Sequence, residues 1–227
     1  FKVGSLISRI YDAIKIRIAN GNALNKGAAP DNDGTLEVDY LLVEAENVQL
    51  YEYYNDTAQD DNNWDVALAR LWGQSFTPST AHTITFVRFY VHRVGTCTGD
   101  STAYIKATDG SGLPTGAILG EGATPTSSIG TTVSWIDYPL ASTSELSAST
   151  KYAAYIDAPN CSGAPTNYLY IHGDSSSPSY TGGCLLNNLS GSWTEACAND
   201  MIFEEYGNPV AGGVIAAPTE GFIITAQ

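Results

Sequence analysis

Residues 83–92 read Thr-Ile-Thr-Phe-Val-Arg-Phe-Tyr-Val-His, which is a clear strand pattern. Successive side chains of a β-strand point to opposite faces, so Val87, Phe89 and Val91 share one face. Aromatic and β-branched residues are typical of strands. The alternation therefore predicts a strand with one apolar face.

Similar short segments recur on both sides of this strand, with turn residues between them. They cover 103–107, 133–138, 152–156, 168–172 and 201–206. Short strands at this spacing, without helices between them, are typical of a β-sandwich. The sequence thus predicts an all-β, jelly-roll-like sandwich over residues 70–206.

Three further segments lie outside the predicted sandwich: a basic N-terminal arm at 1–26, an accessory β and loop segment at 27–69, and an extended C-terminal tail at 207–227. In the arm, Ser5–Ala13 has a helical spacing and Ile14–Ile18 alternates as a strand. Leu36–Val43 reads as another strand. The tail is rich in glycine up to Gly221 and ends on a possible last strand from Phe222.

Charge is divided unevenly along the chain. The first 26 residues contain five basic residues and one acidic residue, which gives the arm +4. The whole chain carries −14, so the other 201 residues carry −18. An acidic body argues against nucleic-acid binding. The sequence has no run of 18 apolar residues that would span a membrane.

Four cysteines indicate two disulfides, which form in an oxidising compartment or in the interior of a hyperthermophile. We expect the oxidising, extracellular setting. Their spacing fits no zinc site because no Cys-x-x-Cys pair occurs. We expect the pairs Cys97–Cys161 and Cys184–Cys197, the second across a hairpin, although three connectivities are possible. Three triplets match the glycosylation pattern, beginning at Asn55, Asn160 and Asn188.

A family resemblance covers about residues 70–206. The segments Gly112-Leu-Pro-Thr-Gly-Ala-Ile-Leu-Gly120 and Leu146-Ser-Ala-Ser-Thr-Lys-Tyr-Ala153 resemble those of choice-of-anchor surface modules. Such modules occur in secreted microbial proteins and in phage-like structural proteins. The resemblance implies a β-sandwich and an exterior location, and it brings no catalytic residues.

The N-terminal arm is the predicted assembly element. Three isoleucines on one strand face contribute about 1.5–3 kcal/mol each when buried. The strand could join its own sandwich or the open sheet edge of a neighbouring copy, because alternation alone does not decide between them. The candidate assembly residues are Leu6, Ile7, Ile10, Ile14, Ile16, Ile18, Phe222, Ile223 and Ile224.

Two candidate ligand sites follow from composition. Four acids in one stretch, Asp56, Asp60, Asp61 and Asp65, suit Ca²⁺ or else form a solvated loop. No other cofactor is expected. Five tyrosines could form a platform for a sugar or a protein partner if their strands lie in one sheet, or could instead lie in the core. They are Tyr90, Tyr104, Tyr155, Tyr168 and Tyr170.

Catalytic motifs such as G-x-S-x-G, H-E-x-x-H and the P-loop do not occur. We therefore expect a non-enzymatic structural protein with three alternative roles. The first is an extracellular, pilus-like filament subunit that binds copies of itself by strand exchange. The second is a virion decoration, tail or fibre protein. The third is an adhesive module that binds a glycan or a cell-surface receptor.

Overall fold

The computed structural model describes residues 14–18, 41–45, 48–189 and 191–210. The chain divides into two compact units, one before Val48 and one from Val48 onward. In the first unit, β1 (Ile14–Ile18) pairs antiparallel with β2 (Leu41–Ala45). The described residues contain no helix long and apolar enough to cross a membrane.

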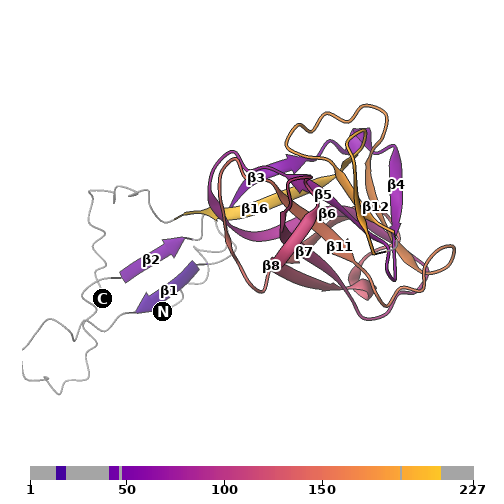
Figure 1. The fold of residues 1–227 in the computed structure, drawn as a ribbon. Helices are drawn as coiled ribbons and strands as arrows, with labels where there is room; N and C mark the ends of the chain where they lie inside the picture. Colours follow the sequence, from indigo (N-terminus) through magenta and orange to yellow (C-terminus); the bar gives the residue numbers. More distant parts are fainter. Residues whose placement is uncertain (1–13, 19–40, 46–47, 190, 211–227) are drawn as a thin grey trace, which may run out of the picture. The chain divides into compact units, whose positions relative to one another are not determined.

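The second unit is a sandwich of two antiparallel sheets, with eight and six strands among the described residues (Figure 1). The eight-stranded sheet contains β3 (Gln49–Tyr54), β4 (Asn62–Val66), β6 (His82–Val94), β9 (Ser134–Pro139), β10 (Glu145–Leu146), β12 (Tyr168–Asp174), β15 (Asp200–Met201) and β16 (Phe203–Pro209). The six-stranded sheet contains β5 (Leu71–Phe76), β7 (Asp100–Thr108), β8 (Pro114–Pro125), β11 (Tyr152–Asp157), β13 (Leu185–Asn188) and β14 (Trp193–Ala196). Two short 3-10 turns, η1 (Thr57–Gln59) and η2 (Thr126–Ser128), lie in connections.

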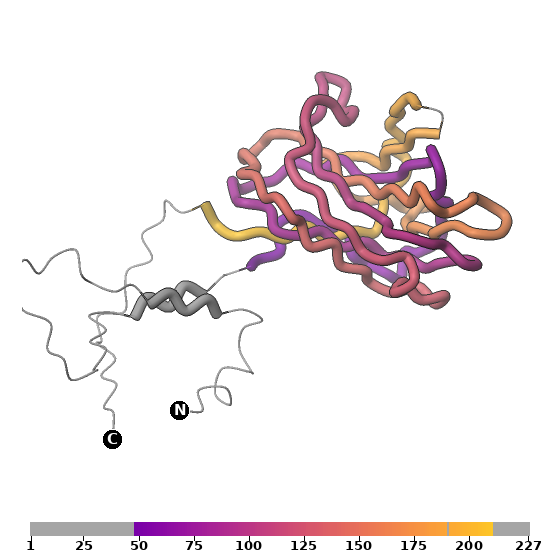
Figure 2. Tube along the Cα trace, turned by 90° about the horizontal axis from the view of Figure 1, so that it is seen from below, coloured from indigo at the N-terminus to yellow at the C-terminus, as the bar shows by residue number. Residues whose placement is uncertain are grey.

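The chain crosses repeatedly between the two sheets, as in a jelly roll. It passes from β4 to β5, back to β6, and then across to β7 and β8. Strands distant in sequence therefore lie side by side, as β3 and β16 do in both ribbon and tube views (Figures 1 and 2). The predicted all-β sandwich is confirmed.

The core fills the space between the sheets. The predicted face of β6 is fully buried, with Val87, Phe89 and Val91 at 0% exposure. Phe76 of the six-stranded sheet meets Phe203 of the eight-stranded sheet at 6.3 Å between ring centroids. Each such side chain contributes about 1.5–3 kcal/mol when removed from water. The alternation read from 83–92 thus marks the true inner face.

The sandwich begins earlier than the sequence predicted. Strands β3 and β4 lie within 27–69, which we assigned to an accessory segment, but both are hydrogen-bonded into the eight-stranded sheet. β3 pairs with β16 and β4 pairs with β12, so both depend on strands more than 100 residues away. Pairing over such a distance leaves no local signal in the sequence.

Both predicted disulfides are confirmed. Cys97–Cys161 joins the loops that follow β6 and β11, and Cys184–Cys197 closes the β13–β14 hairpin. The described residues contain no free cysteine. Two cross-links at separate places limit the unfolded ensemble independently.

Candidate functional site

The outer face of the eight-stranded sheet carries a row of rings. Tyr90 and His92 come from β6, His172 and Tyr170 from β12, and Trp135 from β9. In the order Trp135, Tyr90, His172, His92, Tyr170, neighbouring ring centroids are 5.4, 5.8, 4.9 and 5.3 Å apart. We call these five residues the histidine–aromatic row.

A chain of hydrogen bonds runs through this row from a carboxylate. Asp60 Oδ1 lies 2.7 Å from His172 Nδ1, and His172 Nε2 lies 2.7 Å from His92 Nδ1. Because a carboxylate oxygen accepts, His172 Nδ1 donates to Asp60, while the direction of the bond between the two rings depends on their tautomers. Burial and the neighbouring His172 ring lower the pKa of His92, which favours the neutral ring. The chain fixes both imidazoles in one orientation.

An ion-pair network flanks the row. Arg88 Nε donates to Asp137 at 2.8 Å, and Arg88 Nη1 lies 3.3 Å from Glu204 Oε2. The guanidinium also lies 5.7 Å from the centroid of the Trp135 ring, a cation–π arrangement. The polar groups beside the row are thus already paired within the protein.

The predicted tyrosine platform is divided between the two sheets. Tyr104 of β7 and Tyr155 of β11 belong to the six-stranded sheet, whereas the other three tyrosines belong to the eight-stranded sheet. Tyr168 and Tyr155 are also largely buried, at 7% and 9% exposure. The single-platform prediction is wrong because alternation within a strand identifies a face but not the sheet to which the strand belongs.

A second row of rings lies on the outer face of the six-stranded sheet. Tyr104 stacks on Tyr155 with centroids 5.2 Å apart, and Tyr155 lies 4.8 Å from Trp193 of β14. Gly73 of β5 is opposite Tyr155, and a Cβ there would overlap the Tyr155 Cβ. We call Tyr104, Tyr155 and Trp193 the tyrosine row.

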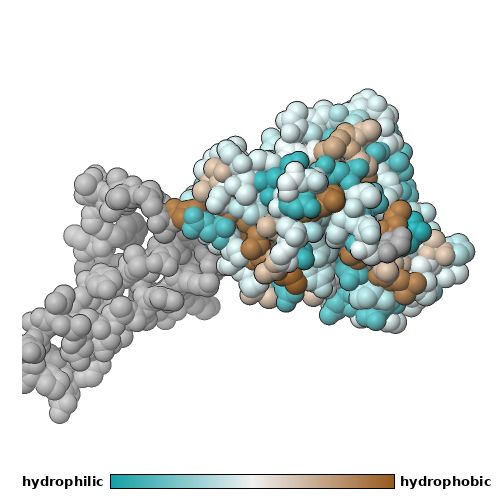
Figure 3. Space-filling model, in the orientation of Figure 1, coloured by the Kyte–Doolittle hydropathy of each residue, from teal (hydrophilic) through white to brown (hydrophobic). Residues whose placement is uncertain are grey.

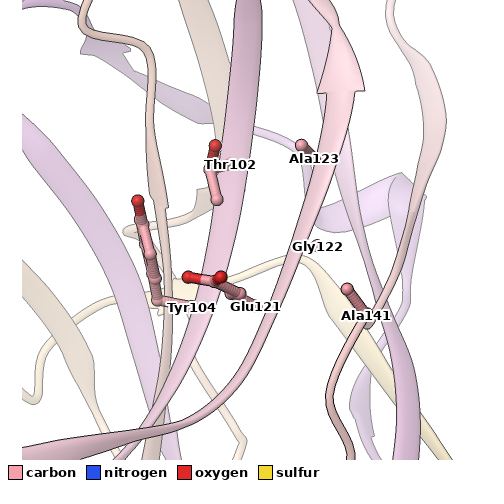
Figure 4. A pocket seen from close by; sticks show the side chains of 6 residues that line it. All are labelled: Thr102, Tyr104, Glu121, Gly122, Ala123 and Ala141. Atoms are coloured by element: carbon pink, nitrogen blue, oxygen red, sulfur yellow. The ribbon is translucent and has the colours of Figure 1, made fainter.

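A shallow hollow of about 300 Å³ adjoins the tyrosine row (Figure 4). Tyr104 forms one side of it and stands directly opposite Glu121 of β8. The remaining lining residues are Thr102, Gly122, Ala123 and Ala141. Figure 4 shows the Tyr104 and Glu121 side chains lying next to each other, with Thr102 beyond them on β7. The hollow therefore combines an aromatic ring with a carboxylate and a hydroxyl.

The four acids considered for calcium have separate partners. Asp56 accepts from the Ala58 amide, Asp60 binds His172, Asp61 accepts from the Ser175 amide, and Asp65 pairs with Arg70. Among the described residues, only Cys184, Glu195 and Cys197 lie close enough together to share an ion. Both of these cysteines are bonded in the disulfide, so the group offers no thiolates. The described geometry gives the calcium prediction no support.

The assembly residues fall mostly outside the described residues. Leu6, Ile7, Ile10, Phe222, Ile223 and Ile224 belong to the parts that the structure does not describe. Strand β1 is described and pairs with β2 of its own chain, a pairing that neither of our two alternatives included. The register places Ile14, Ile16 and Ile18 opposite Ala45, Val43 and Leu41.

The three glycosylation triplets differ in exposure. Asn55 and Asn160 are exposed, as an acceptor must be. Asn188 is buried at 7% exposure, and its side chain accepts a hydrogen bond from the Gly191 amide. A glycan has no room at a side chain this deeply buried in the folded protein, so the structure argues against the third assignment.

Sequence reasoning missed Trp135, Trp193 and the contact between Asp60 and His172, and it did not single out Thr102 or Glu121 of the hollow. The sequence pattern could have identified Trp135, because 133–138 was predicted as a strand in which Trp135 alternates with Ile136. Trp193 follows a Gly-Ser turn without a clear alternating pattern. The Asp60–His172 pair joins residues 112 positions apart, and no local pattern predicts it.

Hydrophobic residues on the sandwich face shown in Figure 3 form several small groups among hydrophilic ones. The described part of this face therefore carries no single broad apolar patch. Comparison with protein-family models and with curated proteins finds no match.

Proposed function

We propose that the protein is a non-enzymatic extracellular structural subunit that assembles with copies of itself through its N-terminal segment. The observation that supports this proposal is the register of β1 and β2. It pairs Ile14, Ile16 and Ile18 with three apolar residues and pairs Lys15 with Glu44. The alternation gives the ribbon of β1 and β2 one face of six apolar positions.

A two-stranded ribbon of this kind needs a further surface. Within the described residues no third strand is hydrogen-bonded to β1 or β2. An isolated pair of strands is marginally stable in water, and its open edges are templates for another strand. Burial of the three isoleucines alone would contribute about 5–9 kcal/mol. An open edge in a neighbouring copy would supply both burial and backbone hydrogen bonds.

Charge and covalent chemistry support the same proposal. The arm at +4 and the remainder at −18 attract each other between copies as well as within one. The two disulfides suit an oxidising, extracellular setting. A filament subunit and a virion subunit would use the arm in the same way, and electron micrographs of the assembled particles distinguish the two.

The test compares two single substitutions in β1 of the full chain. We expect Ile16→Asp to abolish assembly, because it places a carboxylate opposite Val43. Lys15→Ala changes one charge and is expected to weaken assembly only modestly. Sedimentation velocity and electron microscopy measure assembly, and near-ultraviolet circular dichroism confirms that the sandwich is folded. A wild-type monomer, or equal effects of the two substitutions, would refute docking by burial.

A further inference from the structure

The hollow beside the tyrosine row has polar groups that no other part of the described chain uses. The Glu121 carboxylate is exposed and makes no ion pair or side-chain hydrogen bond among the described residues. In the histidine–aromatic row, by contrast, Asp60 and Arg88 are held by protein partners. Of the two rows of rings, the one on the six-stranded sheet is therefore the one that adjoins an unpaired carboxylate.

We propose that this hollow, with the tyrosine row leading into it, binds a neutral saccharide. A pyranose ring has an apolar C–H face and a rim of hydroxyl groups. The Tyr104 ring offers a flat apolar surface for the C–H face of the sugar. The Glu121 carboxylate and the Thr102 hydroxyl can form hydrogen bonds with its hydroxyl groups. The hollow has a volume near the lower end of ligand sites in proteins, which suits one or two sugar units.

Charge decides between neutral and anionic saccharides. The only charged side chain that lines the hollow is Glu121, and it would repel a carboxylate or sulfate group. Asp157 adds a second acid on the same outer face, directly opposite Thr102. Burial raises the pKa of Asp157, and its buried Oδ1 has no hydrogen-bond partner among the described residues. Hydroxyl donors fit this surface and anions do not.

The stacked rings explain how a longer saccharide would be held. Tyr155 is fixed between Tyr104 and Trp193, and it is largely buried. Rings that are held in place lose little freedom when a ligand stacks on them. Tyr104 and Trp193 are both partly exposed, so two separate surfaces are open to successive sugar units.

Isothermal titration calorimetry of the full chain tests this site. The probes are laminarihexaose, cellohexaose, mannohexaose and xylohexaose, with a galacturonate hexamer as the charged probe. We expect at least one neutral probe to bind. We expect the galacturonate hexamer to bind more weakly or not at all. The absence of binding by all four neutral probes, or a preference for the galacturonate hexamer, would overturn the proposal.

Three substitutions locate the binding. Tyr104→Ala is expected to weaken binding about tenfold or more, because it removes the stacking surface. Glu121→Gln, at an exposed position that supports no other residue, is expected to weaken binding without changing the fold. Tyr90→Ala removes a tyrosine from the opposite sheet and should leave binding unchanged. Loss of binding in Tyr90→Ala with retention in both other variants would place the site elsewhere.

The saccharide site and the assembly proposal stand independently. Ile16→Asp is expected to leave the affinity per subunit unchanged, and Tyr104→Ala is expected to leave assembly unchanged. A failure of the saccharide proposal therefore appears in the calorimetric titration, and a failure of the assembly proposal appears in the sedimentation and microscopy measurements.

Discussion

The two disulfides should differ in their contribution to stability because they close loops of different length. Cys97–Cys161 spans 64 residues and Cys184–Cys197 spans 13. The chain-entropy relation gives about 4.3 kcal/mol for the first cross-link and about 2.9 kcal/mol for the second. The difference of about 1.4 kcal/mol is a factor of about ten in the unfolding equilibrium constant.

The perturbation is a pair of double variants, Cys97→Ala/Cys161→Ala and Cys184→Ala/Cys197→Ala. Cys97 and Cys161 lie in the core at 3% and 0% exposure, so lost packing increases the cost of the first variant further. A domain has a total stability of about 5–15 kcal/mol, and the first variant should lose a large part of it.

Urea unfolding followed by tryptophan fluorescence measures the free energy of unfolding of each variant. The slope of the free energy against urea concentration reports whether the unfolded states expose similar surface. We expect the first variant to be the less stable by at least about 1 kcal/mol. An equal or larger loss in the Cys184→Ala/Cys197→Ala variant would refute the argument from loop length.

Three further predictions concern buried positions of the sandwich. Burial lowers the pKa of His82, but the hydrogen bond and charge of Glu205 outweigh this and raise it above 6.5. The interaction of protonated His82 with Glu205 therefore stabilises the folded state fully below pH 6.5, and this stabilisation is lost as pH rises through the folded-state pKa of His82. In Glu205→Gln burial is opposed only by the Thr80 carbonyl and the charge of Glu52, so the pKa of His82 should fall and the loss of stability above pH 6.5 should shrink; unfolding midpoints from pH 5.5 to 8.5 that change in parallel in both proteins would contradict this. Gly73→Ala should cost about 1–3 kcal/mol or more, because a Cβ would overlap the backbone of β11, whereas Gly110→Ala, with no atom within 4 Å, should cost little in the same urea assay. Phe89→Ala should cost about 3–5 kcal/mol, and a loss below 1 kcal/mol in urea unfolding would show that this ring is not part of a packed core.

Local patterns predicted the parts of the fold that depend on neighbouring residues. The inner face of β6 follows from the alternation of Val87, Phe89 and Val91, and all three are fully buried. The hairpin disulfide Cys184–Cys197 follows from a short spacing. Such features need only the geometry of one strand or one turn.

Features that depend on distant pairing were not predictable in this way. Glu205 lies at an inward position of β16 and is fully buried, where a local pattern would place an apolar residue. It is accommodated because His82, 123 residues earlier, lies 2.7 Å from its Oε1. The pairing of β16 with β6 also contains a register shift that leaves Thr85 of β6 without an opposite residue. The buried face of β6 therefore changes from even to odd positions between Ile84 and Val87, both of which are fully buried.

The same distinction explains the division of the tyrosines. Alternation assigned Tyr90 and Tyr104 correctly to outer faces, but the two faces belong to different sheets. Their surroundings then give them different roles. Next to Tyr90, the charged groups bind one another, which stabilises the folded chain and leaves little for a ligand. Next to Tyr104, the Glu121 carboxylate is unpaired, and an exposed unpaired carboxylate beside an aromatic ring stabilises nothing in the protein itself. That difference is the physical reason to look for a ligand on the six-stranded sheet.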